Sequence, residues 1–192
     1  MKQKLRSEIN TKDTWDLTYI YKNEDEFNKE LDSIKKEIQK INEYKGHLLD
    51  SSESLLKYLE FSDVIERKLY KLYYYAHLNL DVDTTNTHYQ QMEGIVSNLL
   101  QEEGIISSFV MPELMKGDYN KVLEFINENK GLEKYRFNLE CIYRYQKHTL
   151  NEEEEKLLSN LSKVLGNSSD VFENLTDADI TFPNIFRKSI NN

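Results

Sequence analysis

The sequence predicts an all-α fold, a multi-helix antiparallel bundle, and two observations carry this prediction. Only six glycines and two prolines occur among the 192 residues, and these are the residues that punctuate turns and break helices. Apolar residues recur at spacings of three and four along most of the chain, which is the period of one helix face. We therefore expect more than 60% helix, arranged as long helices joined by short polar loops.

We expect one helical domain over residues 13–183, between a flexible N-terminal segment at 1–12 and a tail at 184–192. A chain of 192 residues buries roughly 70% of its unfolded surface on folding, which is enough for a real core. No internal repeat, low-complexity tract or long linker divides the sequence.

The first helix is predicted to begin after Asn23, a residue type that caps helix N-termini. Its apolar stripe is Phe27, Leu31, Ile34, Ile38 and Ile41, and Gly46 is the expected stop. The second and longest helix begins at Ser51 or Ser52. We place on its inner face Leu55, Leu56, Leu59, Val64, Ile65, Leu69, Leu72, Tyr73 and Ala76.

A polar run at 81–87 predicts a loop, because its Asp, Asn and Thr side chains hydrogen-bond their own backbone. The third helix follows, with core positions at Met92, Ile95, Val96, Leu99, Leu100 and Ile106. Pro112 opens or interrupts a short helix around Leu114. Asp118 caps a further helix that carries Val122, Leu123 and Ile126 and closes near Gly131. Another helix is marked by Tyr135, Leu139, Ile142 and Tyr143.

The last predicted helix is capped by Thr149 or Asn151 and has glutamates at 152–155 in its first turn. Its expected inward residues are Leu157, Leu158, Leu161, Val164 and Leu165. Gly166 is predicted to end it, and a short helix follows around 171–175. The alternation of polar and apolar residues before Pro183 is compatible with a short strand at 179–182.

Charge and composition exclude several classes of partner. The net charge is −9 and the pI about 5.1, whereas nucleic acids and anionic membranes bind basic surfaces. No stretch approaches the roughly 18 apolar residues of a membrane helix, and no apolar segment follows the basic N-terminus as it would in a signal peptide. A single cysteine, Cys141, allows no internal disulfide. We expect a cytoplasmic protein without nucleic-acid or membrane partners.

The histidines predict no metal site. None of His47, His77, His88 and His148 is followed by glutamate or has a second histidine four residues on, so the zinc-protease motif H-E-x-x-H is absent. His77 and His88 would be about 16 Å apart on a continuous helix, too far to share one ion. We predict no cofactor bound by this chain.

Three other patterns favour structural interpretations. Asp81 and Asp83 resemble the start of a calcium loop, but the required glycine is missing, so we favour a capped turn between two helices. The glutamates at 152–155 are typical of a solvated first turn and not of a catalytic pair, which needs one buried carboxyl. Cys141 has no local catalytic partner and is read as a small apolar residue. We name no catalytic, cofactor-binding or metal-binding residue.

Aromatic residues gather at two places. Trp15, the only tryptophan, precedes the first helix with Tyr19 and Tyr21 close by, and we interpret it as an anchor that ties the N-terminal segment to the core. In the second helix, tyrosines at 70, 73, 74 and 75 cover more than one face. Some of these rings must therefore reach solvent or a cavity, which suggests a partly polar groove, although packing against a neighbouring domain explains them equally well.

Several segments resemble oligoendopeptidase F proteins in the same order. Thr14-Trp15-Asp16-Leu17 followed by Tyr21 is similar to the family's opening T-W-D-L segment. The stretch from Leu72 to Leu78, then Asp81 and Asp83, resembles its Y-A-x-L…D segment. The glutamate run with Leu157-Leu158, and the segment from Leu175 to Phe182, resemble its L-x-x-E-E-E-x-L-L and L-x-x-A-D-[IL]-x-F segments. The resemblance covers about residues 13–186.

The resemblance implies a cytoplasmic zinc metalloendopeptidase, related to thimet-type oligopeptidases, that hydrolyses oligopeptides in a deep channel with mostly helical walls. The family's zinc ligands lie downstream of the matched region, and this sequence ends soon after Phe182. We therefore expect an inactive N-terminal portion that contributes part of the channel wall and partners the missing C-terminal catalytic portion. The alternative is a stand-alone helical module that binds a protein or peptide in a tyrosine-lined groove; an unrelated helical scaffold is a third interpretation.

Overall fold

The computed structural model describes residues 8–146, 150, 152–176 and 180. Helices dominate these residues, and none of them lies in a β-strand, which confirms the predicted all-α fold. No helix in these ranges is long and apolar enough to cross a membrane.

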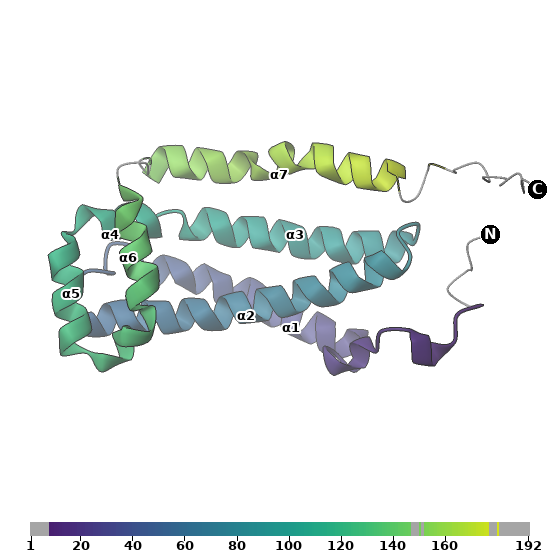
Figure 1. Cartoon of the computed structure of the whole chain (residues 1–192), viewed down its shortest axis with the longest axis horizontal. Helices are drawn as coiled ribbons and strands as arrows, with labels where there is room; N and C mark the ends of the chain where they lie inside the picture. Colours follow the sequence, from purple (N-terminus) through teal and green to yellow (C-terminus); the bar gives the residue numbers. More distant parts are fainter. Residues whose placement is uncertain (1–7, 147–149, 151, 177–179, 181–192) are drawn as a thin grey trace, which may run out of the picture.

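Three long helices form the centre of the molecule. They are α1 (Glu24–Glu37), α2 (Ser52–Val82) and α3 (Thr87–Ser107), and each runs antiparallel to the one before it (Figure 1). Three short helices gather at one end of this bundle, namely α4 (Val110–Lys116), α5 (Tyr119–Glu128) and α6 (Arg136–Arg144). The last helix, α7 (Glu152–Asn174), runs back along α3.

The core lies between α1, α2 and α3 and continues into the short helices. Its largest fully buried side chains are Phe27, Ile34, Ile38, Ile41, Leu48, Leu55, Ile65, Leu69, Leu72, Leu114, Ile126 and Leu132. Most of these belong to the predicted stripes. Val64 and Ile95, which were predicted to face inward, are exposed. Each is one residue, or about 100° of helix rotation, from a buried neighbour, and the packed face is too narrow to include both.

The predicted N-caps of the first helices are confirmed. The side chain of Asn23 accepts a hydrogen bond from the Glu26 N–H at 3.0 Å, and Ser51 accepts one from the Ser54 N–H at 3.1 Å. Asp118 caps α5 by accepting from the Asn120 N–H at 3.1 Å. Each cap supplies an acceptor for a backbone donor that has no partner within the helix.

The stripe of the first predicted helix is shared between two kinds of helix. α1 ends at Glu37, and the chain tightens into a 3₁₀ segment, Ile38–Tyr44. With three residues per turn, Ile38, Ile41 and Tyr44 fall on one side of this segment, and the two isoleucines are buried. Gly46 follows with φ +86°, a conformation that favours glycine, so its role as a stop is confirmed.

α7 corrects two predictions. It passes through Gly166 without a break, so the expected end at Gly166 and the separate helix around 171–175 are wrong. A glycine inside a helix costs only about 1 kcal/mol. Leu157, Leu158 and Leu161 are exposed and not inward. The caps proposed at Thr149 and Asn151, and the side chains of Val164 and Leu165, lie outside the described residues.

The strand suggested at 179–182 falls almost wholly outside the described residues. Ile180 is the one described member, and it lies in no strand. Its N–H donates to the carbonyl oxygen of Leu175 at 2.8 Å, a bond that closes the end of a helix.

Candidate functional site

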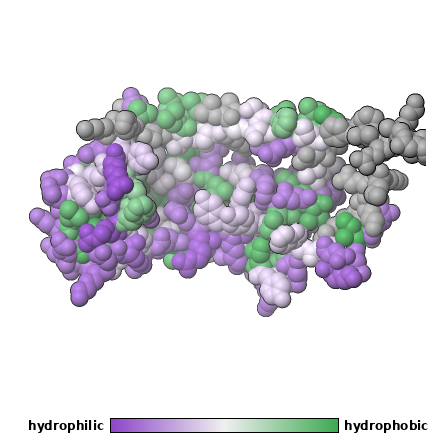
Figure 2. All heavy atoms as spheres, in the orientation of Figure 1, coloured by the Kyte–Doolittle hydropathy of each residue, from purple (hydrophilic) through white to green (hydrophobic). Residues whose placement is uncertain are grey.

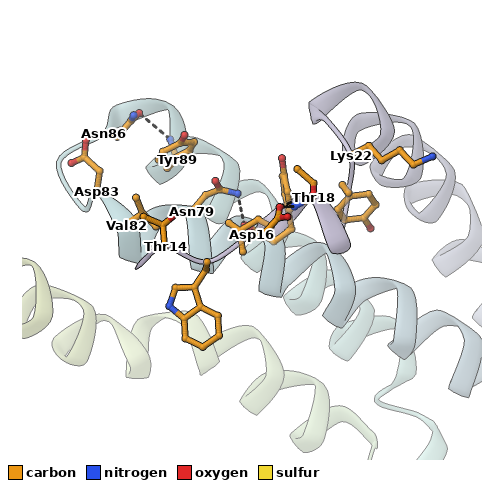
Figure 3. Close-up of a pocket in the computed structure, with 13 residues that line it drawn as sticks. Thr14, Asp16, Thr18, Lys22, Asn79, Val82, Asp83, Asn86 and Tyr89 are labelled. Carbon is orange, nitrogen blue, oxygen red and sulfur yellow. Dashed lines mark hydrogen bonds between the residues drawn. The ribbon is translucent and has the colours of Figure 1, made fainter. Parts of the chain in front are cut away.

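Two segments that are about 60 residues apart in the sequence meet around one hollow. The N-terminal segment from Thr14 to Lys22 lies against the end of α2 and the start of α3 (Figure 3). The hollow has a volume of about 500 Å³. It is lined by Thr14, Trp15, Asp16, Leu17, Thr18, Tyr21, Lys22, Tyr75, Asn79, Val82, Asp83, Asn86 and Tyr89. The fold therefore brings together the T-W-D-L segment and the segment containing Asp83.

The polar side chains around the hollow mostly close their own turns. Asp16 accepts hydrogen bonds from the N–H and hydroxyl of Thr18, at 3.0 and 2.6 Å, and these bonds lower the pKa of the Asp16 carboxyl. Asp83 accepts from the N–H and hydroxyl of Thr85, at 3.1 and 2.7 Å. Asn86 caps α3 by accepting from the N–H groups of His88 and Tyr89, and Figure 3 shows the bond with Tyr89. The predicted capped turn is confirmed at 83–86, whereas Asp81 and Val82 belong to the last turn of α2.

Tyr21, and not Trp15, anchors the N-terminal segment. Trp15 is 80% exposed, whereas Tyr21 is 3% exposed. The Tyr21 ring packs edge-on against Phe27 and Tyr75, with centroids 5.7 and 5.2 Å away. The Lys71 ammonium lies 4.0 Å from its centroid, a cation–π contact. Burial raises the pKa of the Tyr21 hydroxyl, and the nearby Glu30 carboxylate raises it further.

Four rings form a continuous row on α2, which we call the α2 aromatic row: Tyr70, Tyr73, Tyr74 and His77. Neighbouring centroids are 5.1 to 6.3 Å apart, and the Tyr73 and His77 rings are stacked. Tyr70 and Tyr74 are exposed, while Tyr75 points into the core. The prediction that some of these tyrosines reach solvent is confirmed. Burial raises the pKa of Tyr73, and carboxylates from α2, α3 and α7 add to this shift.

The described histidines are separated from one another, and each faces one carboxylate. His47 Nδ1 lies 2.7 Å from Asp50, His77 Nε2 3.8 Å from Asp81, and His88 Nε2 3.0 Å from Glu24. No group of three His, Cys, Asp or Glu side chains within the described ranges could hold a metal ion. The described part of the chain therefore holds no ligand set for the zinc of the family, whose ligands the resemblance places downstream. His148 lies outside the described residues.

Cys141 and the described glutamates of the run at 152–155 belong to no metal-binding group either. Cys141 is a half-buried free thiol on α6. Glu153 and Glu154 are exposed in the first turn of α7, as a solvated helix start requires. The side chains of Glu152 and Glu155 are outside the described set.

The environments of two glutamates, Glu113 and Glu103, were not predicted by any pattern in the sequence. The Glu113 carboxylate accepts from the N–H groups of Gly46 and Leu48, at 2.7 and 2.8 Å, and so fixes the loop between α1 and α2. Glu103 lies half-buried on α3, where burial raises the pKa of its carboxyl and Glu66 adds to the shift, against a hydrogen bond from Ser107. The partners of Glu113 are more than 60 residues away in the sequence, so no local pattern could reveal them.

Comparisons with known proteins agree with the resemblance. A family model described as Oligopeptidase F matches residues 113–182. The oligopeptidase PepF of Bacillus subtilis is 38% identical over 180 residues, covering 94% of this chain and 27% of the relative. An oligoendopeptidase F homolog of Lactococcus lactis is 36% identical over 187 residues, covering 97% of this chain and 31% of the relative.

Two crystal structures have the same fold over most of this chain. The oligoendopeptidase-F of Enterococcus faecium superposes with a TM-score of 0.79 at 30% identity, covering 86% of this chain and 32% of that one. A putative peptidase of Chlamydophila abortus gives 0.66 at 33% identity, covering 95% and 31%. The chain thus spans less than a third of the length of these relatives. Over nearly its whole length it is similar to oligoendopeptidase F proteins, and it corresponds to the N-terminal portion of such a protein.

Proposed function

We propose that this chain is the non-catalytic N-terminal portion of a cytoplasmic zinc metalloendopeptidase that hydrolyses oligopeptides, and that its helices form part of the peptide channel wall. One observation carries the proposal: 94–97% of the chain is similar to oligoendopeptidases, of which it spans only 27–31%. The names of these relatives, oligopeptidase and oligoendopeptidase, denote enzymes that hydrolyse peptides. The zinc ligands belong, on this proposal, to the part of the polypeptide that this chain does not match.

The proposal divides the work between two parts of one enzyme. Zinc bound by the other part supplies a Lewis acid and an activated water for hydrolysis. The helices described here contribute shape, because a rigid helical wall admits an extended peptide and excludes a folded protein.

A hybrid protein tests the proposal. In this hybrid, the chain replaces the matching region of the Bacillus subtilis relative. We expect the hybrid to cleave an internally quenched oligopeptide, to leave a folded substrate protein intact, and to lose activity when a chelator removes its zinc. The chain alone, supplied with zinc, should cleave neither substrate. A hybrid that folds but cleaves no peptide, or zinc-dependent cleavage by the chain alone, would contradict the proposal.

A second candidate function is peptide binding by the chain on its own, and the α2 aromatic row favours it. Tyr70 and Tyr74 present two neighbouring exposed rings, and exposed tyrosines are enriched at sites that bind peptides and proteins. Titration of the chain with unstructured oligopeptides, followed by calorimetry, tests it. Binding that is weakened by Tyr74→Ala but not by Tyr19→Ala would support this function. Tyr19 is a matched control because it is also exposed and lies outside the row. No measurable binding would refute it.

A further inference from the structure

The exposed apolar side chains of α7 lie on one face of the helix. We call this set the α7 stripe: Leu157, Leu158, Leu161, Val171, Phe172 and Leu175, the last just beyond the end of α7. At 100° per residue, the six positions fall within an arc of about 140°. Their exposed fractions range from 41% to 64%. Figure 2 shows hydrophobic surface along α7 at the edge of the molecule. Such a stripe is typical of a helix face that packs against another part of a protein.

The α7 stripe does not pack against the bundle. α7 lies along α3 (Figure 1), and the Gln101 side chain donates to the carbonyl oxygen of Asn160 at 3.3 Å. Asp170 is close enough to Tyr73 of α2 to add to the rise in the pKa of that tyrosine, which is caused mainly by burial. On the helix, Asp170 lies nearly opposite the centre of the stripe. The side of α7 that approaches the bundle is therefore polar, and the apolar side is turned away.

Burial ends abruptly along the sequence. The core includes residues from Tyr21 to Leu139, and none of the described residues after Leu139 is buried. A stripe of six large apolar side chains on the surface is unusual for a protein that remains alone, because such patches usually mark an interaction site.

Charge argues against a second copy of this chain as the occupant. The chain carries a net charge of −9, and the exposed side chains of Glu153 and Glu154 lie within the same arc of α7 as the stripe. A symmetric contact between two α7 helices would bring these like charges together. The matched relatives, in contrast, contain more than two-thirds of their length outside the region that corresponds to this chain. The match to the family model at 113–182 includes all of α7.

We propose that the α7 stripe is the docking surface for the part of an oligoendopeptidase F polypeptide that lies outside the region matched by this chain. The inference rests on the proposed function and adds to it the contact surface. α7 is then the helix by which the N-terminal bundle is joined to the remainder of the enzyme.

The test compares the same substitutions in two proteins, the chain alone and the hybrid with the Bacillus subtilis relative. Leu161→Gln and Phe172→Gln each remove one member of the stripe, and Val64→Gln removes a comparably exposed apolar side chain from α2. We expect both stripe substitutions to lower the Tm of the hybrid by roughly 1–2 °C and to leave the Tm of the chain alone unchanged. Val64→Gln should change neither protein. Equal effects of the stripe substitutions in both proteins, no effect in the hybrid, or an equal loss with Val64→Gln would overturn the proposal.

Two readouts separate this inference from the proposed function. Peptide cleavage by the hybrid with an intact stripe tests the function alone. An active hybrid whose Tm ignores the stripe substitutions overturns only the docking surface. A stripe-dependent Tm in an inactive hybrid overturns only the function. Sedimentation of the chain alone should give a monomer, and a dimer that Leu161→Gln dissociates would overturn the proposal in favour of self-association.

Discussion

Several single side chains form hydrogen bonds between residues that are about 30 positions apart in the sequence. Lys68 on α2 donates to both carboxylate oxygens of Glu37, at 2.9 and 2.6 Å, and these bonds, with one from Ser33, lower the pKa of the Glu37 carboxyl. The Tyr143 hydroxyl donates to the carbonyl oxygen of Leu114 at 2.6 Å. Such bonds satisfy partly buried polar groups, which would otherwise cost free energy on folding.

The N-terminal anchor gives the first prediction. Tyr21→Ala should lower the free energy of unfolding by about 3 kcal/mol, because it removes a buried ring and its contacts with Phe27, Tyr75 and Lys71. Trp15→Ala should change it by less than about 0.5 kcal/mol, since the indole is exposed. Urea denaturation of the two variants measures both. A larger loss for Trp15→Ala than for Tyr21→Ala would reverse the assignment of the anchor.

Glu103 gives a prediction about pH. Its carboxyl pKa is raised in the folded protein because the group is desolvated, so the ionised form disfavours folding at neutral pH. This penalty begins to disappear as the pH falls through the folded-state pKa, and it is gone below the unfolded-state pKa of about 4.3. Glu103→Gln should therefore raise the urea midpoint at pH 7 and not at pH 4.

The neighbouring Glu102 is the matched control for this experiment. It is exposed and accepts a hydrogen bond from Gln39, so Glu102→Gln should change the free energy of unfolding by less than about 0.5 kcal/mol at both pH values. A gain for Glu103→Gln that is the same at pH 7 and pH 4 would show that desolvation of a charge is not its cause.

At the scale of helices, local signals predict the starts well and the ends less well. Asn23, Ser51 and Asp118 cap the helices expected of them because a cap depends on residues only two or three positions away. The helix end predicted at Gly166 was wrong because it depends on more than the neighbouring residues. Whether a glycine terminates a helix depends on the backbone conformation that the surroundings require, and α7 requires none with a positive φ.

Periodicity finds an apolar stripe but not what the stripe faces. The positions of Ile34 and Leu161 look alike in the sequence, yet the first is fully buried and the second is exposed. The hollow between the N-terminal segment and the α2–α3 turn was also beyond prediction, because it depends on how distant segments pack. The resemblance supplied the two motifs, and only the structure shows that they meet.

Gly166 tests whether α7 is continuous, and Gly46 is the contrasting glycine with a positive φ. Gly166→Ala should stabilise α7 by about 0.5–1 kcal/mol, because alanine is the better helix former and the added methyl group meets only open space. Gly46→Ala should destabilise the protein by about 1–2 kcal/mol, since its φ of +86° disfavours a Cβ. Hydrogen exchange of α7 amides measures the first and urea denaturation the second. Faster exchange in α7 after Gly166→Ala would show that the helix ends at Gly166, as the sequence predicted.

The whole molecule divides into a bundle with a closed core and one helix beside it. Residues up to Leu139 hold every buried side chain in the described part of the chain, and α7 adds none. Burying the six members of the α7 stripe would contribute several kcal/mol at about 1.5–3 kcal/mol per fully buried side chain. That contribution is comparable with the stability of a typical domain, so α7 lacks, in the chain alone, the packing that stabilises most helices.

Local stability should therefore differ sharply between α2 and α7. Amides of α2 near Leu69 and Leu72, where the core is fully buried, should exchange with solvent only when the whole bundle unfolds. Amides of α7 should exchange through local opening, at a free energy at least about 2 kcal/mol lower. The exposed stripe should also bind a hydrophobic dye, and Phe172→Gln should reduce that binding. In the hybrid, where the stripe has a polypeptide to pack against, exchange in α7 should approach that of α2. Equal protection of α2 and α7 in the chain alone, with no dye bound, would show that the bundle stabilises α7 without a partner.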